Sequence, residues 1–285
     1  MKLIRFGKQG EEKPGILLNN EERIDVSSFV KDYDEEFFTT GGLINLKDWL
    51  SHNEATAPRL DDSVRLGSPI ARPSKIICIG LNFKDHAAES GFDAPDEPVI
   101  FGKATSAISG PYDNIIIPRG SEQTDWEVEL AVVIGKKASY VDQDQALDYV
   151  AGYVLHNDVS ERTFQKDRGG QWIKGKSADT FAPLGPFMAT TDEIENINDM
   201  RMWLNVNGDN MQEGNTSNLI FGVDHIISYL SQFMSLLPGD VISTGTPAGV
   251  GMGMDPEVYL KPGDIVELGI DGLGSSKQNV VAFEG

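Results

Sequence analysis

The chain has 285 residues, 40% hydrophobic and 24% charged, which is enough to bury a substantial core in an ordinary globular protein. Its 24 basic and 44 acidic residues leave a net charge of −20, and this balance disfavours nucleic acid and anionic membranes as partners. The single cysteine, Cys78, excludes a disulfide within the chain. With no apolar leader or membrane-length run in the sequence, we expect a cytoplasmic protein.

Residues 1–70 are expected to form a small separate domain that contains β-strands. Short β-type runs come first and an amphipathic stretch follows, at Lys2–Phe6, Gly15–Leu18, Arg23–Val26 and Leu43–Leu50. The glycine and proline of Gly67–Pro73 are typical of a linker. A larger catalytic domain is then expected over residues 73–285.

From Lys75 onward the sequence consists mainly of short β-type segments separated by turn residues. The expected strands are Ile76–Ile79, Ile115–Ile117, Trp126–Ile134, Gly152–Asn157, Met202–Val206, Val241–Ser243, Ile265–Ile270 and Asn279–Phe283, with a hairpin turn at Asp271-Gly272. The expected helices are Asn82–Gly91, Gln143–Val150 and Val223–Leu236. This pattern predicts a β-rich α+β fold without the regular alternation of a doubly wound sheet.

Three acids lie in or beside two of these strands. On the strand Trp126–Ile134, Glu127 and Glu129 point to the same side, because side chains alternate along a strand. Asp158 follows the strand Gly152–Asn157, and neighbouring strands would bring it beside the two glutamates. Three carboxylates without a histidine or cysteine pattern favour a hard cation such as Mg²⁺, Mn²⁺ or Ca²⁺. The alternative is two solvated acids and a turn residue.

The histidines and the cysteine carry weaker signals. His86 and Glu89 are three residues apart, so on a helix they are neighbours and form either a general-base pair or a surface pair. His156 and His225 are interpreted as structural. Cys78 lies within an apolar run and is interpreted as a small buried hydrophobic residue rather than a nucleophile.

Two glycine-rich stretches offer groups that bind anions. The stretch 169–177 contains two lysines, which near an acidic metal cluster would stay charged and hold an anionic substrate or an enolate oxygen, or else lie on the surface. The loop 243–251 offers backbone N–H groups and hydroxyls. The loop 243–251 has neither the Walker lysine spacing nor the dinucleotide-binding pattern, so it does not support nucleotide binding.

Taken together, these segments resemble the fumarylacetoacetate hydrolase superfamily over residues 73–285. Each motif alone is weak, but their joint order along the chain is highly specific. The matching segments are 80–89 (GLNFKDHAAE), 101–103 (FGK), 126–130 (WEVEL), 157–162 (NDVSER), 175–177 (GKS), 179–186 (DTFAPLGP) and 244–251 (TGTPAGVG).

The resemblance implies a catalytic domain built as a mixed β-sandwich roll, assembled as a homodimer and holding Mg²⁺ or Mn²⁺. By matching motif, it makes Glu127, Glu129 and Asp158 the metal ligands. His86 and Glu89 become the pair that activates water, Lys176 the catalytic lysine that also contacts substrate, Thr246 a contact of the substrate carboxylate, and Arg162 and Gln165 pocket residues. Thr163 and Ala178 depart from the usual family pattern, which leaves the shape of the substrate open.

The activity expected from the resemblance is metal-dependent hydrolysis of the C3–C4 bond of a 2,4-dioxo acid. The whole arrangement looks closest to the hydrolases of 2,4-diketo-3-deoxy-L-fuconate and L-rhamnonate, so a sugar-derived acid is the expected small-molecule partner. Oxaloacetate decarboxylase, 2-hydroxyhepta-2,4-diene-1,7-dioate isomerase or decarboxylase, and ureidoglycolate lyase are the alternative activities. A metal-dependent binder of 2-oxo acids without catalysis is the non-enzymatic alternative.

Overall fold

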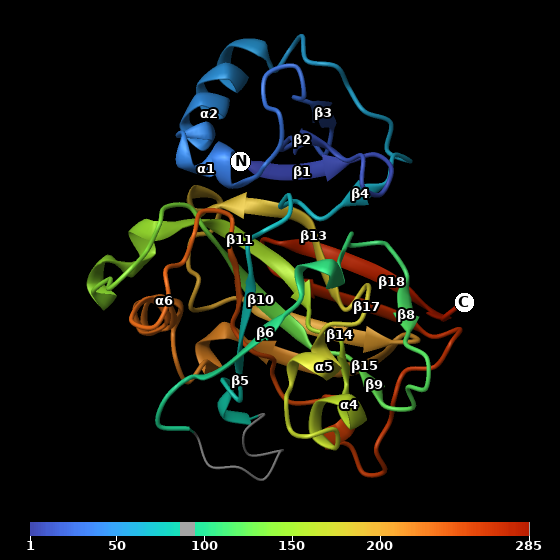
Figure 1. Ribbon diagram of the computed structural model, residues 1–285. Coiled ribbons are helices and arrows are strands. Elements are labelled where there is room, and N and C mark those ends of the chain that lie inside the picture. The colour runs from blue at the N-terminus through green and yellow to red at the C-terminus, as the bar shows by residue number, and fades with distance from the viewer. Residues whose placement is uncertain (86–94, 285) are drawn as a thin grey trace.

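The computed structural model describes residues 1–85 and 95–284 and shows a strand-rich α+β fold, as predicted (Figure 1). One large sheet runs through the molecule in the order β3-β2-β1-β13-β11-β10-β16-β5-β6. Its strands are β1 (Lys2–Phe6), β2 (Lys13–Leu17), β3 (Arg23–Asp25), β5 (Ile76–Gly80), β6 (Val99–Lys103), β10 (Val128–Ile134), β11 (Val150–Asn157), β13 (Ala182–Thr190) and β16 (Val241–Ser243). The short strands β4 (Leu66–Gly67) and β7 (Ile108–Ser109) pair with β1 and β13.

The N-terminal elements gather at one end of the molecule, where α1 (Glu35–Thr39) and α2 (Gly42–Asn53) lie beside β1–β3 (Figure 1). Strand β1 pairs antiparallel with β13, so the N-terminal strands continue the large sheet. The domain boundary near residues 70–73 stays a prediction.

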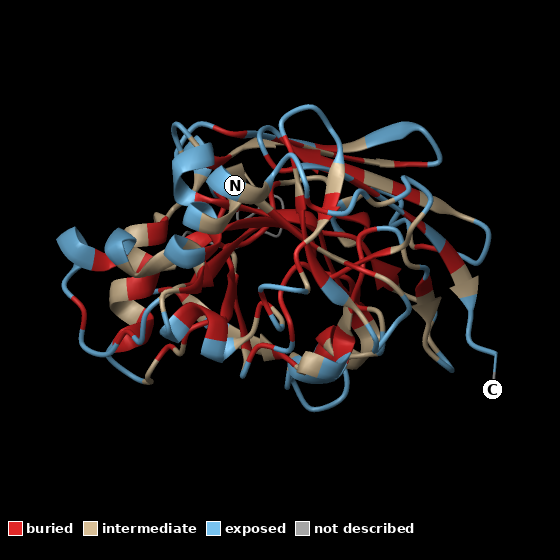
Figure 2. Ribbon diagram, turned by 90° about the horizontal axis from the view of Figure 1, so that it is seen from above, coloured by how far each residue is buried: buried red, intermediate tan, exposed pale blue. Residues whose placement is uncertain are grey.

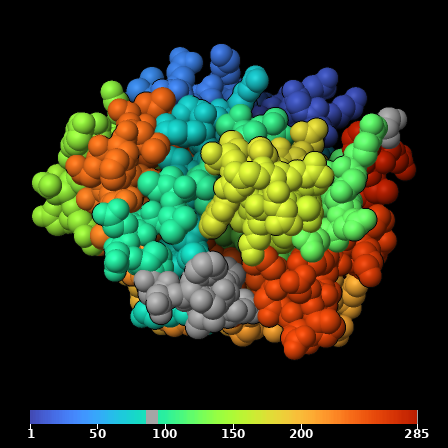
Figure 3. Space-filling view, turned by 60° about the horizontal axis from the view of Figure 1, so that its bottom comes forward, coloured from blue at the N-terminus to red at the C-terminus, as the bar shows by residue number. Residues whose placement is uncertain are grey.

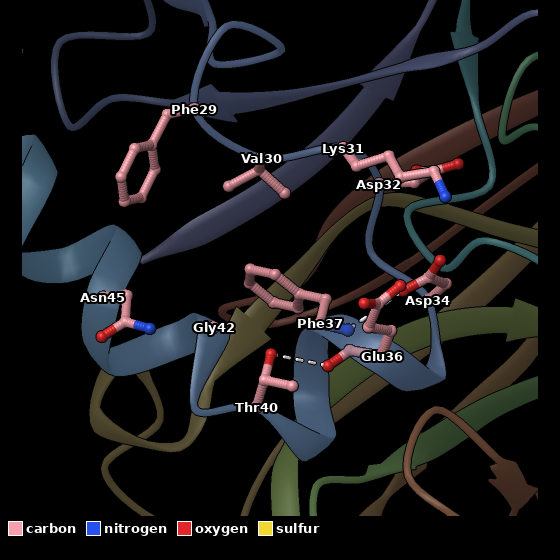
Figure 4. Close-up of a pocket in the computed structure, with 10 residues that line it drawn as sticks. All are labelled: Phe29, Val30, Lys31, Asp32, Asp34, Glu36, Phe37, Thr40, Gly42 and Asn45. Carbon is pink, nitrogen blue, oxygen red and sulfur yellow. Dashed lines mark hydrogen bonds between the residues drawn. The ribbon is translucent and has the colours of Figure 1, made fainter.

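A hollow of about 230 Å³ lies between the Phe29–Asp34 segment and the helices α1 and α2 (Figure 4). Asp34 caps the start of α1, because its Oδ1 accepts a hydrogen bond of 3.0 Å from the Phe37 N–H.

The middle of the large sheet forms the core of the molecule. Buried residues concentrate in the interior of the molecule (Figure 2), and every residue of β10 is buried. Its run of valine, leucine and isoleucine is covered on both faces. A second sheet in the order β15-β14-β17-β18-β8 packs against β10, β11 and β13. Its strands are β8 (Ile115–Ile117), β14 (Arg201–Val206), β15 (Asp209–Asn215), β17 (Ile265–Ile270) and β18 (Gly274–Ala282).

Short elements complete the described chain. Strands β9 (Thr124–Asp125) and β12 (Ser160–Glu161) form a small ladder, and the helices α4 (Arg162–Lys166) and α5 (Ile173–Lys176) follow it. The remaining elements are α6 (Val223–Ser231) and the 3-10 helices at Thr105–Ala107, Gln143–Tyr149, Thr191–Glu193, Thr216–Asn218 and Gly251–Gly253. None of the described helices has the length and apolarity needed to span a membrane.

Several predicted elements differ from the observed ones. The strand expected from Trp126 begins only at Val128, because Trp126 and Glu127 lie in a break between β9 and β10. The strands β6, β13 and β15 were not predicted from the sequence. In β13, Pro183 and Pro186 lack the N–H groups that a strand normally uses, so its sequence does not look like a strand. The expected helix from Gln143 is a 3-10 helix, and α6 ends at Ser231, short of Leu236. Most of the helix expected over Asn82–Gly91 lies outside the described residues.

Candidate metal centre and active site

Three carboxylates converge from three different places in the fold. Glu127 stands in the break before β10, Glu129 lies on β10, and Asp158 lies in the turn after β11. All three are buried, and one oxygen of each lies within 4.8 Å of an oxygen of the other two. Among the described residues this is the only group of its kind.

Backbone contacts fix the break that carries Glu127. Its carbonyl oxygen accepts a hydrogen bond of 2.9 Å from the Asp158 N–H, and its own N–H donates to Asn157 Oδ1 at 3.2 Å. The next N–H along the chain, that of Val128, donates to Gln212 Oε1 at 3.0 Å. These contacts replace the regular ladder and hold Glu127 beside Asp158.

Two buried lysines approach the acids from different elements. Lys176, at the end of α5, has its Nζ 2.7 Å from Glu127 Oε2 and 2.9 Å from Asp158 Oδ2. Lys103, at the end of β6, has its Nζ 2.5 Å from Asp158 Oδ1. Burial alone would raise the pKa of Asp158, but the two ammonium groups outweigh burial and hold that pKa below the usual range.

A buried arginine, Arg162, pairs with Glu127 and with a fourth acid, Asp125. Arg162 Nη2 lies 2.7 Å from Glu127 Oε1 and 2.8 Å from Asp125 Oδ2, and its Nη1 donates to Gln165 Oε1 at 3.1 Å. Asp125 also accepts hydrogen bonds from the N–H groups of Gly251 and Met252, at 2.7 and 3.0 Å. Asp125 thus connects Arg162 to the backbone of Gly251 and Met252.

Glu129 is the acid that no described basic side chain pairs with. Its Oε2 accepts hydrogen bonds from Ser243 Oγ at 2.5 Å and from the Gly245 N–H at 3.0 Å. Burial, and then the charges of Asp158 and Glu127, raise the pKa of Glu129 well above its ordinary value. A carboxyl group in this position favours its protonated form unless a cation lies beside it.

The donor set fits a hard divalent cation. Oxygens that share one Mg²⁺ lie about 3–4 Å apart, and those around Ca²⁺ up to about 5 Å, so the observed carboxylates are close enough to share an ion. Each carboxylate oxygen has two lone pairs, so a hydrogen bond from a lysine does not prevent it from binding a cation. With every group ionised, four acids (Asp125, Glu127, Glu129, Asp158) face three bases (Lys103, Arg162, Lys176), which leaves one negative charge in excess. A divalent cation would reverse this excess and leave the site suited to a small anion.

A pocket of about 500 Å³ opens over the carboxylates. Glu127, Glu129 and Lys176 line its floor, and the rings of Phe101 and Trp172, 5.2 Å apart between centroids, form an apolar wall. On the molecular surface, residues of α4 and α5 lie beside the segment near residue 250 (Figure 3). Further lining residues are Ile79, Gly80, Leu81, Arg162, Gln165, Lys166, Gly245, Thr246, Met252, Gly253 and Glu257.

Most of the predicted site residues therefore lie together. The structure brings Glu127, Glu129, Arg162, Gln165, Lys176 and Thr246 around one pocket, and Asp158 lies buried beside them in contact with Lys176. The Thr246 hydroxyl donates to the Val128 carbonyl at 2.9 Å and accepts from Gln212 Nε2 at 2.8 Å. His86 and Glu89 lie outside the described residues, so their assigned roles stay predictions.

Sequence reasoning missed three residues of the site. Lys103 belongs to the 101–103 motif but was given no role, Asp125 directly precedes the acid-bearing segment, and Ser243 begins the predicted anion-binding loop. Only their contacts with Asp158, Arg162 and Glu129 identify them. Cys78 is fully buried, as predicted, and burial raises the pKa of its thiol.

The chain belongs to the fumarylacetoacetate hydrolase family. The family model described as "Fumarylacetoacetate (FAA) hydrolase C-terminal" matches residues 75–281. The superfamily resemblance predicted from the sequence is therefore confirmed. The prediction that the protein is an enzyme is supported, because solved structures similar to this chain include hydrolases and an isomerase.

Similar proteins extend the match to the whole chain. A Burkholderia ambifaria protein named "Putative hydrolase" is 51% identical over 280 residues, which is 98% of each chain. The structure of a fumarylacetoacetate hydrolase from Exiguobacterium antarcticum has a TM-score of 0.87 and 36% identity, covering 99% of this chain and 100% of that one. A maleylpyruvate hydrolase from Sphingobium sp. SYK-6, solved with manganese(II) and pyruvate, has a TM-score of 0.83 and 28% identity over 100% of both chains.

Proposed function

We propose that the protein is a divalent-metal-dependent hydrolase that cleaves the C3–C4 bond of a 2,4-dioxo acid of the acylpyruvate type. The products are pyruvate, or a related 2-oxo acid, and a carboxylic acid. The observation that carries the proposal is the group of three buried carboxylates, two of which line a pocket that also presents a buried lysine. A family relative solved with manganese(II) and pyruvate supports both the cation and the substrate class.

Glu127, Glu129 and Asp158 are the proposed ligands of Mg²⁺ or Mn²⁺, with Ca²⁺ able to occupy the same oxygens. The bound cation would act as a Lewis acid toward the carboxylate and 2-keto oxygens of the substrate. The raised pKa of Glu129 supports this assignment, because a divalent cation gives that carboxyl group the direct positive partner that it lacks among the described side chains.

Lys176 is the proposed catalytic lysine. Burial alone would lower its pKa, but Asp158 and Glu127 outweigh burial and raise it, so the ammonium stays charged. Its Nζ also lies 4.8 Å from the centre of the Phe101 ring, at the edge of the pocket. A fixed positive charge here would stabilise the negative charge that develops on the 2-keto oxygen as C3–C4 breaks.

Thr246, Arg162 and Gln165 are the proposed substrate-binding residues. Thr246 contacts the substrate carboxylate in this assignment, and its neighbours Gly245 and Gly253 leave room at the pocket wall. Arg162 is already shared between Asp125 and Glu127, so its main contribution is to hold Glu127 in place. Gln165 accepts from Arg162 through its carbonyl oxygen, so its amide nitrogen is the group proposed to donate to a ligand.

Water addition is assigned to His86 and Glu89, which lie outside the described residues. In this proposal Glu89 and His86 remove a proton from water, and the oxygen adds to the C4 carbonyl carbon. The C3–C4 bond then breaks with its electron pair moving to C3 and the 2-keto oxygen. Protonation of C3 gives the 2-oxo acid, and C4 leaves as the carboxylic acid.

A sugar-derived 2,4-diketo-3-deoxy acid is the proposed substrate. Beyond the carboxylates, Gln165, Lys166 and Glu257 supply both donors and acceptors to the outer part of the pocket, which suits a chain of hydroxyl groups. The homodimer and the cytoplasmic location stay predictions from the resemblance and the composition.

The direct experiment is a panel of 2,4-dioxo and 2-oxo acids incubated with purified protein and Mg²⁺ or Mn²⁺. Pyruvate release is followed by a coupled NADH assay, and chelation of the metal is the control. We expect release from sugar-derived 2,4-dioxo acids that stops on chelation. Decarboxylation of oxaloacetate alone, isomerisation of a hydroxydienedioate, cleavage of ureidoglycolate alone, or metal-dependent binding without any product would each reject the hydrolase assignment.

A further inference from the structure

We infer that Ser243 and His156 are positioning residues, which form a hydrogen-bonded chain that orients the Glu129 carboxylate toward the cation site. The inference rests on the metal centre of the proposed function and extends it to two residues outside the assigned ligand set. His156 carries its proton on Nδ1 in this arrangement, and its imidazole acts on the site only through Ser243.

The sheet places the three side chains next to one another. Glu129 pairs with His156 across β10 and β11, while Ala131, two residues further along β10, pairs with Ser243 of β16. Glu129 is therefore flanked by one residue from each neighbouring strand. All three side chains are buried, with 2% of Glu129 and none of Ser243 or His156 exposed.

The chain of hydrogen bonds is short and continuous. His156 Nδ1 lies 2.6 Å from Ser243 Oγ, and Ser243 Oγ lies 2.5 Å from Glu129 Oε2. The Gly245 N–H donates to the same Oε2 at 3.0 Å. Glu129 Oε2 thus receives two donors, one from a side chain and one from the backbone.

Counting the protons assigns the direction of each bond. A cation-bound carboxylate only accepts hydrogen bonds, so the single hydroxyl proton of Ser243 goes to Glu129. Ser243 Oγ then accepts from His156, whose Nδ1 must carry a proton. The opposite tautomer would place a buried N–H on Nε2, which has no hydrogen-bond partner among the described residues and would be costly to leave unpaired.

This arrangement gives the two oxygens of Glu129 different roles: Oε2 accepts the hydrogen bonds that orient the carboxylate, and Oε1 is left to bind the cation. Because Oε2 is held by Ser243 and Gly245, Oε1 accepts none of the hydrogen bonds between described residues, and the carboxylate lines the pocket. Partners that orient a ligating side chain typically change metal affinity about 10- to 100-fold when removed. Ser243 and His156 are expected to act in this way.

Calorimetric titration with Mg²⁺ and Mn²⁺ tests the inference in the full-length protein without substrate. Ser243→Ala, which removes the donor to Glu129, should weaken binding about 10- to 100-fold. His156→Leu, which removes the donor to Ser243, should weaken it about 10-fold, whereas His156→Asn keeps an N–H near the Nδ1 position and should stay within about threefold of wild type. Thermal unfolding of each variant confirms that it is folded.

The tautomer gives a second readout that a purely structural histidine would not show. Imidazole ¹⁵N spectra of the Mg²⁺-loaded protein, with His156→Asn used for assignment, should show a protonated Nδ1 and an unprotonated Nε2. A proton on Nε2, or wild-type affinity in folded Ser243→Ala, overturns the inference. If wild type binds no divalent cation, the inference falls with the metal centre. If it binds the cation and shows this tautomer but releases no pyruvate from any substrate, only the proposed function fails.

Discussion

Lys103 Nζ lies 2.5 Å from Asp158 Oδ1, and neither side chain exposes any surface. Burial, with the nearby charge of Lys176 adding to it, lowers the pKa of Lys103 despite the attraction of Asp158. A buried ion pair of this kind adds little net stability compared with apolar residues, but removing one partner leaves the other charge uncompensated. Its value here is to hold Asp158 at a defined place beside Glu127 and Glu129.

Lys103→Met should destabilise the protein by about 3–5 kcal/mol, because Asp158 loses one of its two ammonium partners in a buried site. Urea denaturation of the metal-free protein measures the change. The double variant Lys103→Met/Asp158→Leu should recover part of the loss, since both charges of the pair are then absent and Lys176 keeps Glu127 as its partner. A loss below about 1 kcal/mol in the single variant would show that Asp158 does not depend on Lys103.

Glu129→Gln should abolish measurable Mg²⁺ binding, because it replaces the only one of the three carboxylates that no described base neutralises. Glu213→Gln, an exposed acid on β15 that pairs with Arg201, is the matched control and should bind Mg²⁺ as wild type does. Calorimetry measures both. Unchanged affinity in Glu129→Gln would remove Glu129 from the ligand set.

The pH dependence of stability should differ between the metal-free and metal-loaded proteins. The folded-state pKa of Glu129 is raised above its unfolded value, so its contribution to stability is complete below the ordinary pKa of a glutamate. That contribution is lost as pH rises through the raised pKa. Mg²⁺ should restore it, so the metal-induced rise in Tm should grow with pH, and binding should release a proton in calorimetry. A metal effect independent of pH in wild type, or equal proton release by Glu129→Gln, would contradict this.

Gly80→Ala should disturb the aromatic wall of the pocket. A Cβ at Gly80 would lie 2.7 Å from Trp172 Cζ3, so the indole that packs beside Phe101 must shift. We expect a drop in kcat/KM and a loss of about 1–3 kcal/mol of stability from overpacking. The double variant Gly80→Ala/Trp172→Leu relieves the clash and should regain the stability. Wild-type kinetics in Gly80→Ala would mean that the Trp172 ring does not shape the pocket.

His86→Ala should separate two reactions of the proposed site. Hydrolysis of an acylpyruvate needs an attacking water, whereas loss of CO₂ from oxaloacetate does not. The variant should therefore stop acylpyruvate hydrolysis while retaining any oxaloacetate decarboxylation that the wild type shows. Steady-state assays of both substrates measure the split. An equal loss of both activities would show that the role assigned to His86 is wrong.

Local patterns predicted much of the fold and the acids of the site. Glu129 and Asp158 could be found because one lies on an apolar strand and the other directly follows one, and such positions are visible along the sequence. Glu127 was placed beside them for a partly wrong reason: it lies in a break before the strand and is held there by Asn157 and Asp158.

The supporting residues could not be predicted because their roles depend on which strands become neighbours. Ser243 meets Glu129 only through the pairing of β16 with β10, and His156 only through the pairing of β11 with β10. Lys103 lies 55 residues from Asp158 in sequence, so no local spacing joins them. The local sequence pattern therefore identifies acidic residues on strands. The residues that hydrogen-bond or pair with those acids can be identified only once the order of the strands in the sheet is known.

Anomalous diffraction from crystals grown with Mn²⁺ tests the central claim most directly. We expect one Mn²⁺ peak at about 2.0–2.4 Å from an oxygen of each of Glu127, Glu129 and Asp158. A map without a peak at these carboxylates at a saturating Mn²⁺ concentration, with Lys103, Arg162 and Lys176 still paired with them, would contradict it.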